Sequence, residues 1–347
     1  MIRSRMNAQN VETSSSFGIQ GGLRLASVDD VTEFGRGLEA WEAVYEQLSP
    51  GRFEGRIREI WVDEGLEILW ELGSQSVWTA GCNVGGVVSF GVPMASGGAG
   101  LYYGVPLDDG VVTYLPGGGE FEIFCRGAMD MVSATVSEKL LQGFASADSP
   151  QLAEVLVPQP LIRQRPQQAA RLRRALTEIV RAVERHPDLL RIEASRKAMR
   201  DCVLAMAVET LDLGARKLTC SLHPSAKAWI VRSVREYALD RPKDPLNISD
   251  LCQLFRVSRR SLQYAFEDLT GMGAVQFLRN VRLNAVRRDI RRLTTDSSES
   301  IANIAARWGF WHLPRFAEYY RTLFGELPSE TRQRVHGRGL ILPAAHN

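Results

Sequence analysis

The chain has 347 residues, 45% of them hydrophobic and 24% charged, a composition that excludes a largely disordered or collagen-like protein. No run of 18 apolar residues occurs, and no apolar segment follows the basic residues at the start, so we expect no transmembrane helix, no secretory signal and a cytoplasmic location. The net charge of +2 conceals a split. Residues 1–160 hold 9 basic and 21 acidic side chains (9 − 21 = −12), and residues 161–347 hold 33 and 19 (33 − 19 = +14). A basic C-terminal half indicates an anionic partner, and the alternative is that the charges are unevenly spread by chance.

The first half of the chain contains short β-branched and aromatic runs separated by glycine-rich turns. Strands at this spacing are typical of a sandwich or a barrel. Ahead of them, Leu38, Trp41, Tyr45 and Leu48 recur at steps of three and four, which predicts an amphipathic helix over 32–48. The predicted strands are 57–62, 66–72, 84–90, 111–115, 121–126 and 129–136.

Helical patterns begin at Pro166 and continue almost to the end of the chain. One apolar face holds Leu172, Leu176, Ile179 and Val183, and it serves either as a dimer seam or as packing against the β domain. A second helix is expected over 189–213, followed by a linker over 213–224.

Residues 247–271 have the pattern of a helix-turn-helix unit. Asn247 can cap the first helix, Ser258 can cap the second, and Gly271 can end it. The residues expected on the outer face of the second helix can contact bases, because Arg pairs with guanine and Gln with adenine, or can contact phosphates. These residues are Arg259, Arg260, Gln263 and Tyr264.

A second unit of the same kind follows. Ser298 or Ser300 can start its first helix, Gly309 can form the turn, and Pro314 fits the first turn of its second helix. Arg315 is the expected reader of bases or phosphates, and Glu318 either accepts from cytosine or is a solvated charge.

One long helix is predicted between the two units, over 274–293. Twenty helical residues span about 30 Å, close to the ~34 Å that separates successive major grooves on one side of DNA. Its arginines either neutralise phosphates or form a solvated basic face, and they are Arg279, Arg282, Arg287, Arg288, Arg291 and Arg292.

Residues 246–334 resemble the DNA-binding domain of the AraC/XylS family of bacterial transcription regulators. The matching run is Ile301-Ala302-x-Ile304-Ala305, Gly309-Phe310, Phe316, Tyr320-Arg321, Phe324-Gly325, Pro328-Ser329 and Arg332. Residues 283–288 and 308–312 further resemble the ethanolamine-utilisation regulator subgroup of that family.

The resemblance implies that two helix-turn-helix units grip one asymmetric half-site. The implied DNA-contacting residues of the first unit are Ser258, Arg259, Arg260, Gln263 and Tyr264, and those of the second are Trp311, His312, Leu313, Pro314, Arg315 and Glu318. Leu313 and Pro314 depart from typical readers, so the second unit reads thymine methyls or DNA shape, or mainly holds the backbone. Arg256 stands where a small turn residue is more comfortable.

The resemblance also implies the overall plan, an α+β protein. It comprises a cupin-like, effector-sensing β-barrel over 1–160 with flanking helices, a helical dimerisation segment and linker over 161–222, and an all-α DNA-binding domain over 223–347. The implied partners are double-stranded DNA, RNA polymerase, a second copy of the chain and a small effector. The predicted function is a cytoplasmic transcription regulator rather than an enzyme.

Several kinds of chemistry are missing from the sequence. No histidine precedes His186, so we expect a metal-free β domain, no serine triad and no cofactor. A barrel enzyme built on carboxylates such as Glu67 and Glu122 stays open, as does a barrel that binds only a protein partner. The five cysteines are expected to be buried thiols, with oxidant sensing as the alternative.

The aromatic residues of the β domain have two interpretations. They either line an apolar effector pocket or fill the core, and they are Trp61, Trp70, Trp78, Phe90, Tyr102, Tyr103, Tyr114, Phe121 and Phe124.

Overall fold

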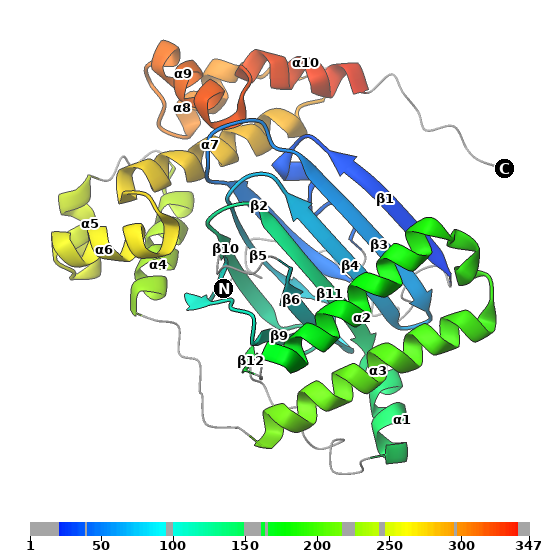
Figure 1. The fold of residues 1–347 in the computed structure, drawn as a ribbon. Coiled ribbons are helices and arrows are strands. Elements are labelled where there is room, and N and C mark those ends of the chain that lie inside the picture. Colours follow the sequence, from blue (N-terminus) through cyan, green and yellow to red (C-terminus); the bar gives the residue numbers. More distant parts are fainter. Residues whose placement is uncertain are drawn as a thin grey trace.

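The computed structural model describes residues 21–38, 40–94, 100–148, 161–163, 166–216, 226–242, 247–294 and 297–338. It is an α+β fold with antiparallel sheets in the N-terminal part and helices in the C-terminal part (Figure 1). Most of the expected linker over 213–224, and with it Cys220, lies outside the described residues.

Two antiparallel sheets form the N-terminal domain. The seven-stranded sheet has the order β1-β3-β4-β11-β6-β9-β12, and the five-stranded sheet has the order β2-β5-β10-β7-β8. Their bounds are β1 Gly22–Val28, β2 Trp41–Gln47, β3 Gly55–Asp63, β4 Leu66–Gly73, β5 Val77–Asn83, β6 Val87–Pro93, β7 Gly100–Tyr102, β8 Val105–Pro106, β9 Val111–Leu115, β10 Glu120–Cys125, β11 Met129–Ser137 and β12 Leu161–Arg163.

The prediction of a cupin-like barrel is not confirmed, because the described strands pair into two separate sheets and do not close into a barrel. Short alternating strands produce the same sequence rhythm in a sandwich and in a barrel, since both bury one face of each strand. The core between the sheets includes Phe34, Tyr45, Leu69, Tyr102 and Phe121.

The expected helix over 32–48 is also wrong. The chain forms only a short 3-10 turn, η2 Val31–Glu33, and then the strand β2. Gly37 adopts a φ of +77°, which interrupts any helix there, and a Cβ on Gly35 would meet the ring of Tyr45. Trp41, Ala43 and Tyr45 therefore reach the inter-sheet space as alternate residues of a strand.

Helices cover the outer face of the seven-stranded sheet (Figure 1). They are α1 Glu138–Asp148, α2 Pro166–Arg185, the short η4 Pro187–Leu190 and α3 Glu193–Arg216. The apolar face of α2 is committed to this packing, because Leu172, Leu176 and Val183 are buried in the same core as Trp70 and Phe90. Of the two roles considered for this face, the structure supports packing within the chain.

The C-terminal domain contains seven described helices, of which α7 is the longest and lies between the other two groups (Figure 1). They are α4 Ala226–Asp240, α5 Ile248–Phe255, α6 Arg259–Thr270, α7 Ala274–Arg292, α8 Ile301–Arg307, α9 Leu313–Phe324 and α10 Pro328–Arg338. The outer face of the five-stranded sheet packs directly on this domain, where Trp78 and Phe124 share a core with Val234 and Phe277.

Candidate nucleic-acid interface

The first helix-turn-helix unit is formed by α5 and α6, and its ends are capped as the sequence predicts. Asn247 and Asp250 form a reciprocal capping box with two bonds of 3.0 Å. Ser258 Oγ accepts from the backbone N–H of Ser261 at 3.0 Å and starts α6. Arg256 ends α5 in the left-handed region at a φ of 52°, the strained position that the sequence indicated.

Helix α6 buries one face and exposes the other. Leu262, Ala265, Phe266 and Leu269 are in the core, which fixes the helix on α4 and α7. All the predicted readers of this unit are therefore exposed, and they are Ser258, Arg259, Arg260, Gln263 and Tyr264.

The reader side chains of α6 are supported by neighbours one turn away. The guanidinium of Arg260 donates to the Tyr264 hydroxyl at 3.2 Å and lies 5.2 Å from the centre of its ring. Gln263 donates to the carboxylate of Glu267 at 2.8 Å. Such pairs at i, i+4 hold the polar heads over one face of the helix without burying them.

The second unit is formed by α8 and α9. Ser300, and not Ser298, caps α8 by accepting from the N–H of Asn303 at 3.1 Å. Gly309 takes a φ of +81° in the turn. His312 caps α9, because its Nδ1 accepts from the backbone N–H of Arg315 at 3.2 Å. The predicted residues of this unit are also all exposed, and they are Trp311, His312, Leu313, Pro314, Arg315 and Glu318.

The second unit is fixed on α7 by aromatic packing. Phe316, Tyr320 and Phe324 form the buried face of α9, with neighbouring ring centres 5.8 and 4.6 Å apart. The indole N–H of Trp308 donates to Asp289 of α7 at 2.8 Å. Helix α7 lies between the two units, and its 19 residues give it a length of about 28 Å.

The arginines of α7 do not form one outward face, which corrects the expectation of a phosphate-contacting helix. Arg287 is only 2% exposed, and Arg288 and Arg291 bind carboxylates of the N-terminal domain. Arg292 is exposed, and Arg279 is half-buried, with its guanidinium 4.1 Å from the ring centre of Tyr319.

Asp30 holds one end of α7. Its carboxylate accepts from Arg287 at 2.8 and 3.1 Å and from Arg291 at 2.8 Å. Burial raises the pKa of Asp30, but the two guanidinium groups outweigh burial and hold the pKa below its ordinary value. Arg287 also contacts Glu326 at 2.8 Å, so one guanidinium joins the N-terminal domain to the segment after α9.

Glu46 holds the middle of the interface in the same way. Its carboxylate is 0% exposed and accepts from Arg235 of α4 at 2.9 and 3.0 Å and from Arg288 of α7 at 2.9 Å. Burial raises the pKa of Glu46, and the two arginines reverse this and lower it. The guanidinium of Arg235 also lies 3.3 Å from the ring centre of Trp78.

Two asparagines of α7 complete the backbone bonds at the end of β2. The side chain of Asn284 accepts from the N–H of Gln47 at 2.9 Å and donates to its carbonyl at 2.8 Å. Asn280 donates to the carbonyl of Leu48 at 2.9 Å. The end of the edge strand β2 is therefore satisfied by a helix instead of by another strand.

Sequence reasoning missed this interface between the domains. Asp30, Glu46, Asn280 and Asn284 were not singled out, although the charge split was a usable signal. Opposite net charges on two halves of one chain predict attraction between those halves as well as an anionic partner.

The remaining features considered from the sequence are the cysteines, a metal site and a transmembrane helix. Cys82 and Cys125 are buried as expected, whereas Cys202 is exposed and Cys252 is partly exposed. Burial raises the pKa of Cys125 to about 12, which keeps it a thiol. Within the described ranges, no three His, Cys, Asp or Glu side chains gather as a metal site. No helix in that part of the chain combines the length and hydropathy needed to cross a membrane.

Comparison with known proteins gives a family match in the C-terminal third of the chain. A family model described as "Helix-turn-helix domain" covers residues 251–334. The XylDLEGF operon transcriptional activator 2 of Pseudomonas putida is 40% identical over 98 residues, which are 28% of this chain and 62% of that protein. The probable thc operon regulatory protein of Rhodococcus erythropolis is 36% identical over 106 residues, 30% of this chain and 32% of that protein.

Among solved structures, a probable AraC family transcriptional regulator from Rhodopseudomonas palustris is 33% identical, with a TM-score of 0.28. The match covers 31% of this chain and 97% of that chain. The chain thus spans less than two thirds of the length of the two curated relatives. None of these matches supports the ethanolamine-utilisation subgroup in particular.

Proposed function

We propose that this chain, whose residues 251–334 belong to the AraC/XylS family of DNA-binding domains, is a sequence-specific transcription regulator that responds to a small effector. The observation that carries the proposal is the arrangement of α6 and α9. Each helix buries its apolar face, and the two helices with the residues just before them expose all eleven side chains that the sequence assigns to DNA contact.

In this proposal α6 and α9 enter successive major grooves of double-stranded DNA. The helix between the two units, α7, is about 28 Å long, close to the ~34 Å between successive grooves. Arg260 and Gln263 supply most of the base discrimination, because their side chains can form paired hydrogen bonds to guanine and adenine. Arg315 contacts a base or a phosphate, while Leu313 and Pro314 offer apolar contact to thymine methyls.

The N-terminal domain sets the position of the DNA-binding domain. Asp30 and Glu46 each bind two arginines of the C-terminal domain, so a shift of η2 or β2 is transmitted to α7. If α7 can take two positions, an effector that binds one of these two states of the protein more tightly would change how the chain grips DNA. That change would promote or block RNA polymerase. We place this regulator in the cytoplasm, acting as a homodimer on paired half-sites.

An enzymatic function is less well supported. The carboxylates considered for a barrel enzyme, Glu67 and Glu122, do not line the cavity between the sheets. Glu122 instead lies 3.5 Å from Arg232 of α4, at the contact between the domains. A cavity in the sandwich also favours a small-molecule ligand over a fully packed scaffold for a protein partner.

Selection from a random pool of duplexes tests the proposal. The purified full chain should enrich one motif whose two conserved patches lie about one helical turn apart. The double variant Arg260→Ala/Gln263→Ala should lose one patch and keep the other, because α9 is intact. Enrichment of no motif by the parent chain, or of the same complete motif by the variant, would contradict the proposal.

A further inference from the structure

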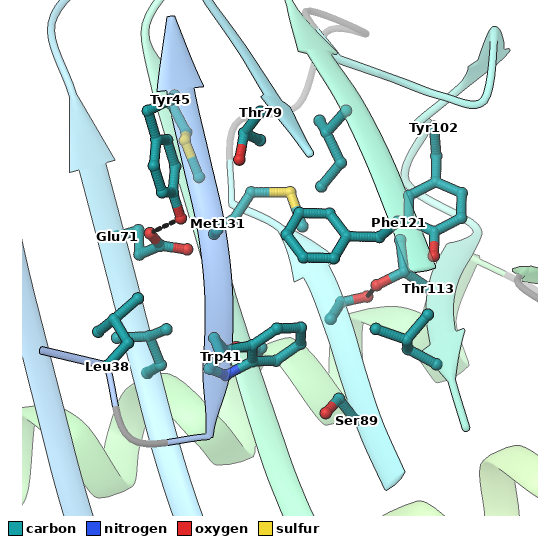
Figure 2. A pocket seen from close by; sticks show the side chains of 17 residues that line it. Leu38, Trp41, Tyr45, Glu71, Thr79, Ser89, Tyr102, Thr113, Phe121 and Met131 are labelled. Atoms are coloured by element: carbon teal, nitrogen blue, oxygen red, sulfur yellow. Dashed lines mark hydrogen bonds between the residues drawn. The ribbon is translucent and has the colours of Figure 1, made fainter. Parts of the chain in front are cut away.

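A cavity lies between the two sheets, lined by residues of both (Figure 2). Its volume is about 50 Å³, and because one water needs ~10–15 Å³, it has room for roughly three to five water-sized groups. Most of its wall is apolar, with Trp41, Phe121 and Met131 among the lining side chains. The space therefore suits a molecule of a few heavy atoms rather than a large metabolite.

Three side chains of the wall, Tyr102, Trp41 and Thr79, carry a buried donor with no hydrogen-bond partner among the described residues. The hydroxyl of Tyr102 and the indole N–H of Trp41 are buried and form no hydrogen bond in the structure. The Tyr102 side chain is 2% exposed, so bulk water does not satisfy its hydroxyl. Buried donors of this kind are normally satisfied, which points to a ligand atom that accepts a hydrogen bond here.

An acceptor faces the same space. Glu71 lines the cavity, and its Oε1 accepts from the Tyr45 hydroxyl at 2.5 Å (Figure 2). Glu71 is the only charged side chain among the described residues of the lining, and no Lys, Arg or His joins them. Burial raises the pKa of Glu71 to about 7, the Tyr45 bond opposes this rise, and nearby Glu59 adds to it. An organic anion would thus meet a carboxyl and no cation in a poorly solvated site.

We propose that this cavity binds a small uncharged molecule that carries a hydroxyl or amide group on a short apolar stem. The polar group accepts from Tyr102 or Trp41 and donates to Glu71, and the stem contacts Phe121 and Met131. An uncharged ligand carries no desolvation cost of an ion, and it fits whether or not Glu71 is protonated.

The position of the cavity on β2 connects it to the contact between the domains. Tyr45 lines the cavity, and the next residue, Glu46, binds Arg235 and Arg288. Successive side chains of a strand point to opposite faces, so one strand contacts the ligand on one side and the DNA-binding domain on the other. This coupling rests on the proposed regulatory function, whereas ligand binding itself does not.

Methyl NMR of the full chain with isotope-labelled methionine tests the binding, because Met129 and Met131 line the cavity. Four matched three-carbon probes are propan-1-ol, propionamide, propionate and propylammonium. We expect saturable shifts of both methyl signals with the alcohol and the amide, and affinities at least about ten-fold weaker for the two ions. Met131→Leu, which conserves volume, assigns the signal.

Matched tyrosine variants locate the site. Tyr102→Phe should weaken propan-1-ol about ten-fold, because it removes the unpartnered hydroxyl. Tyr103→Phe is the control, since that hydroxyl already donates to the Glu120 carbonyl at 2.7 Å and lies outside the lining. A Tyr102→Phe variant with unchanged propan-1-ol affinity would overturn the assigned hydroxyl.

The absence of any methyl shift with the alcohol and the amide would overturn the proposal, as would ion binding of equal or greater affinity. These titrations contain no DNA, so their failure leaves the DNA-binding function standing. The converse also holds, because a chain that binds propan-1-ol but selects no DNA motif would refute only the regulator.

Discussion

Two sets of arginines in the C-terminal domain have opposite surroundings. Those on the helix-turn-helix faces, such as Arg260 and Arg315, are exposed and lie over tyrosine rings. Those at the end of α7, such as Arg287 and Arg291, are turned onto Asp30 of the N-terminal domain. One residue type thus serves two purposes, and only the first set is available to a nucleic acid.

The largest expected effect comes from removing the buried Arg287. Arg287→Ala should lower the free energy of unfolding by about 3–5 kcal/mol, because it leaves the buried Asp30 and Glu326 with one guanidinium fewer. Arg292→Ala is the control, since this side chain on the same helix is exposed and its loss should cost less than ~0.5 kcal/mol. Urea unfolding of both variants measures the difference, and equal losses would refute the inward role of Arg287.

The stability contributed by two buried carboxylates, Asp30 and Glu71, should depend on pH in opposite directions. Asp30 has arginine partners and a lowered pKa, so its contribution to stability is present above its ordinary pKa of 3.8 and is lost as the pH falls. Glu71 has no cationic partner in the cavity wall, and its pKa rises from 4.5 to about 7. The folded chain then holds a proton that the unfolded chain has released, and stability falls as the pH rises from 4.5 through 7.

Glu71→Gln should remove this slope. Relative to the parent, the variant should gain up to roughly 3 kcal/mol between pH 4.5 and pH 8, because 2.5 pKa units correspond to that free energy. Glu64→Gln, at an exposed position beside β4, should shift stability by less than ~0.5 kcal/mol at either pH. Parallel pH profiles for the parent and Glu71→Gln would contradict the raised pKa.

The turn of the first unit offers a smaller effect. Arg256 adopts a φ of 52°, where a non-glycine residue is strained, so Arg256→Gly should raise the free energy of unfolding by up to ~1 kcal/mol. Thermal unfolding measures the gain. Destabilisation would show that the Arg256 side chain makes a contact that outweighs its backbone strain.

The smallest expected effect is on the salt dependence of DNA binding, which should differ between variants at Arg292 and Arg288 of α7. Arg292 is exposed, so Arg292→Ala should lower the magnitude of the slope of log affinity against log salt by about 0.9, or about threefold in affinity between 50 and 200 mM salt. Arg288 binds Glu46, so Arg288→Ala should leave the slope unchanged. The reverse order would place the inward arginines on DNA.

The C-terminal domain was largely predictable, because its signals are local. Capping residues such as Asn247 and Ser258 and the turn glycines Gly309 and Gly325 determine helix ends within a few residues. The exposed readers follow directly from helical periodicity once those ends are known.

The N-terminal domain was predicted less well, because its errors concern contacts between distant residues. The spacing of Leu38, Trp41, Tyr45 and Leu48 suits a helix, but Trp41 and Tyr45 also share one face of a strand, and the pairing of β2 with β5 decides between the two. Barrel and sandwich likewise differ in which strands pair and not in the strands themselves. The Arg287–Asp30 and Arg288–Glu46 pairs each join residues more than 240 positions apart in the sequence, beyond any local pattern.

Fluorescence anisotropy with two duplexes tests the central claim most directly. One duplex carries the motif selected by the parent chain, and the other has the same composition in scrambled order. Arg260→Ala should lose about 1–3 kcal/mol of binding free energy on the selected duplex and almost nothing on the scrambled one. Equal changes on both duplexes, or no change on either, would contradict base reading by α6.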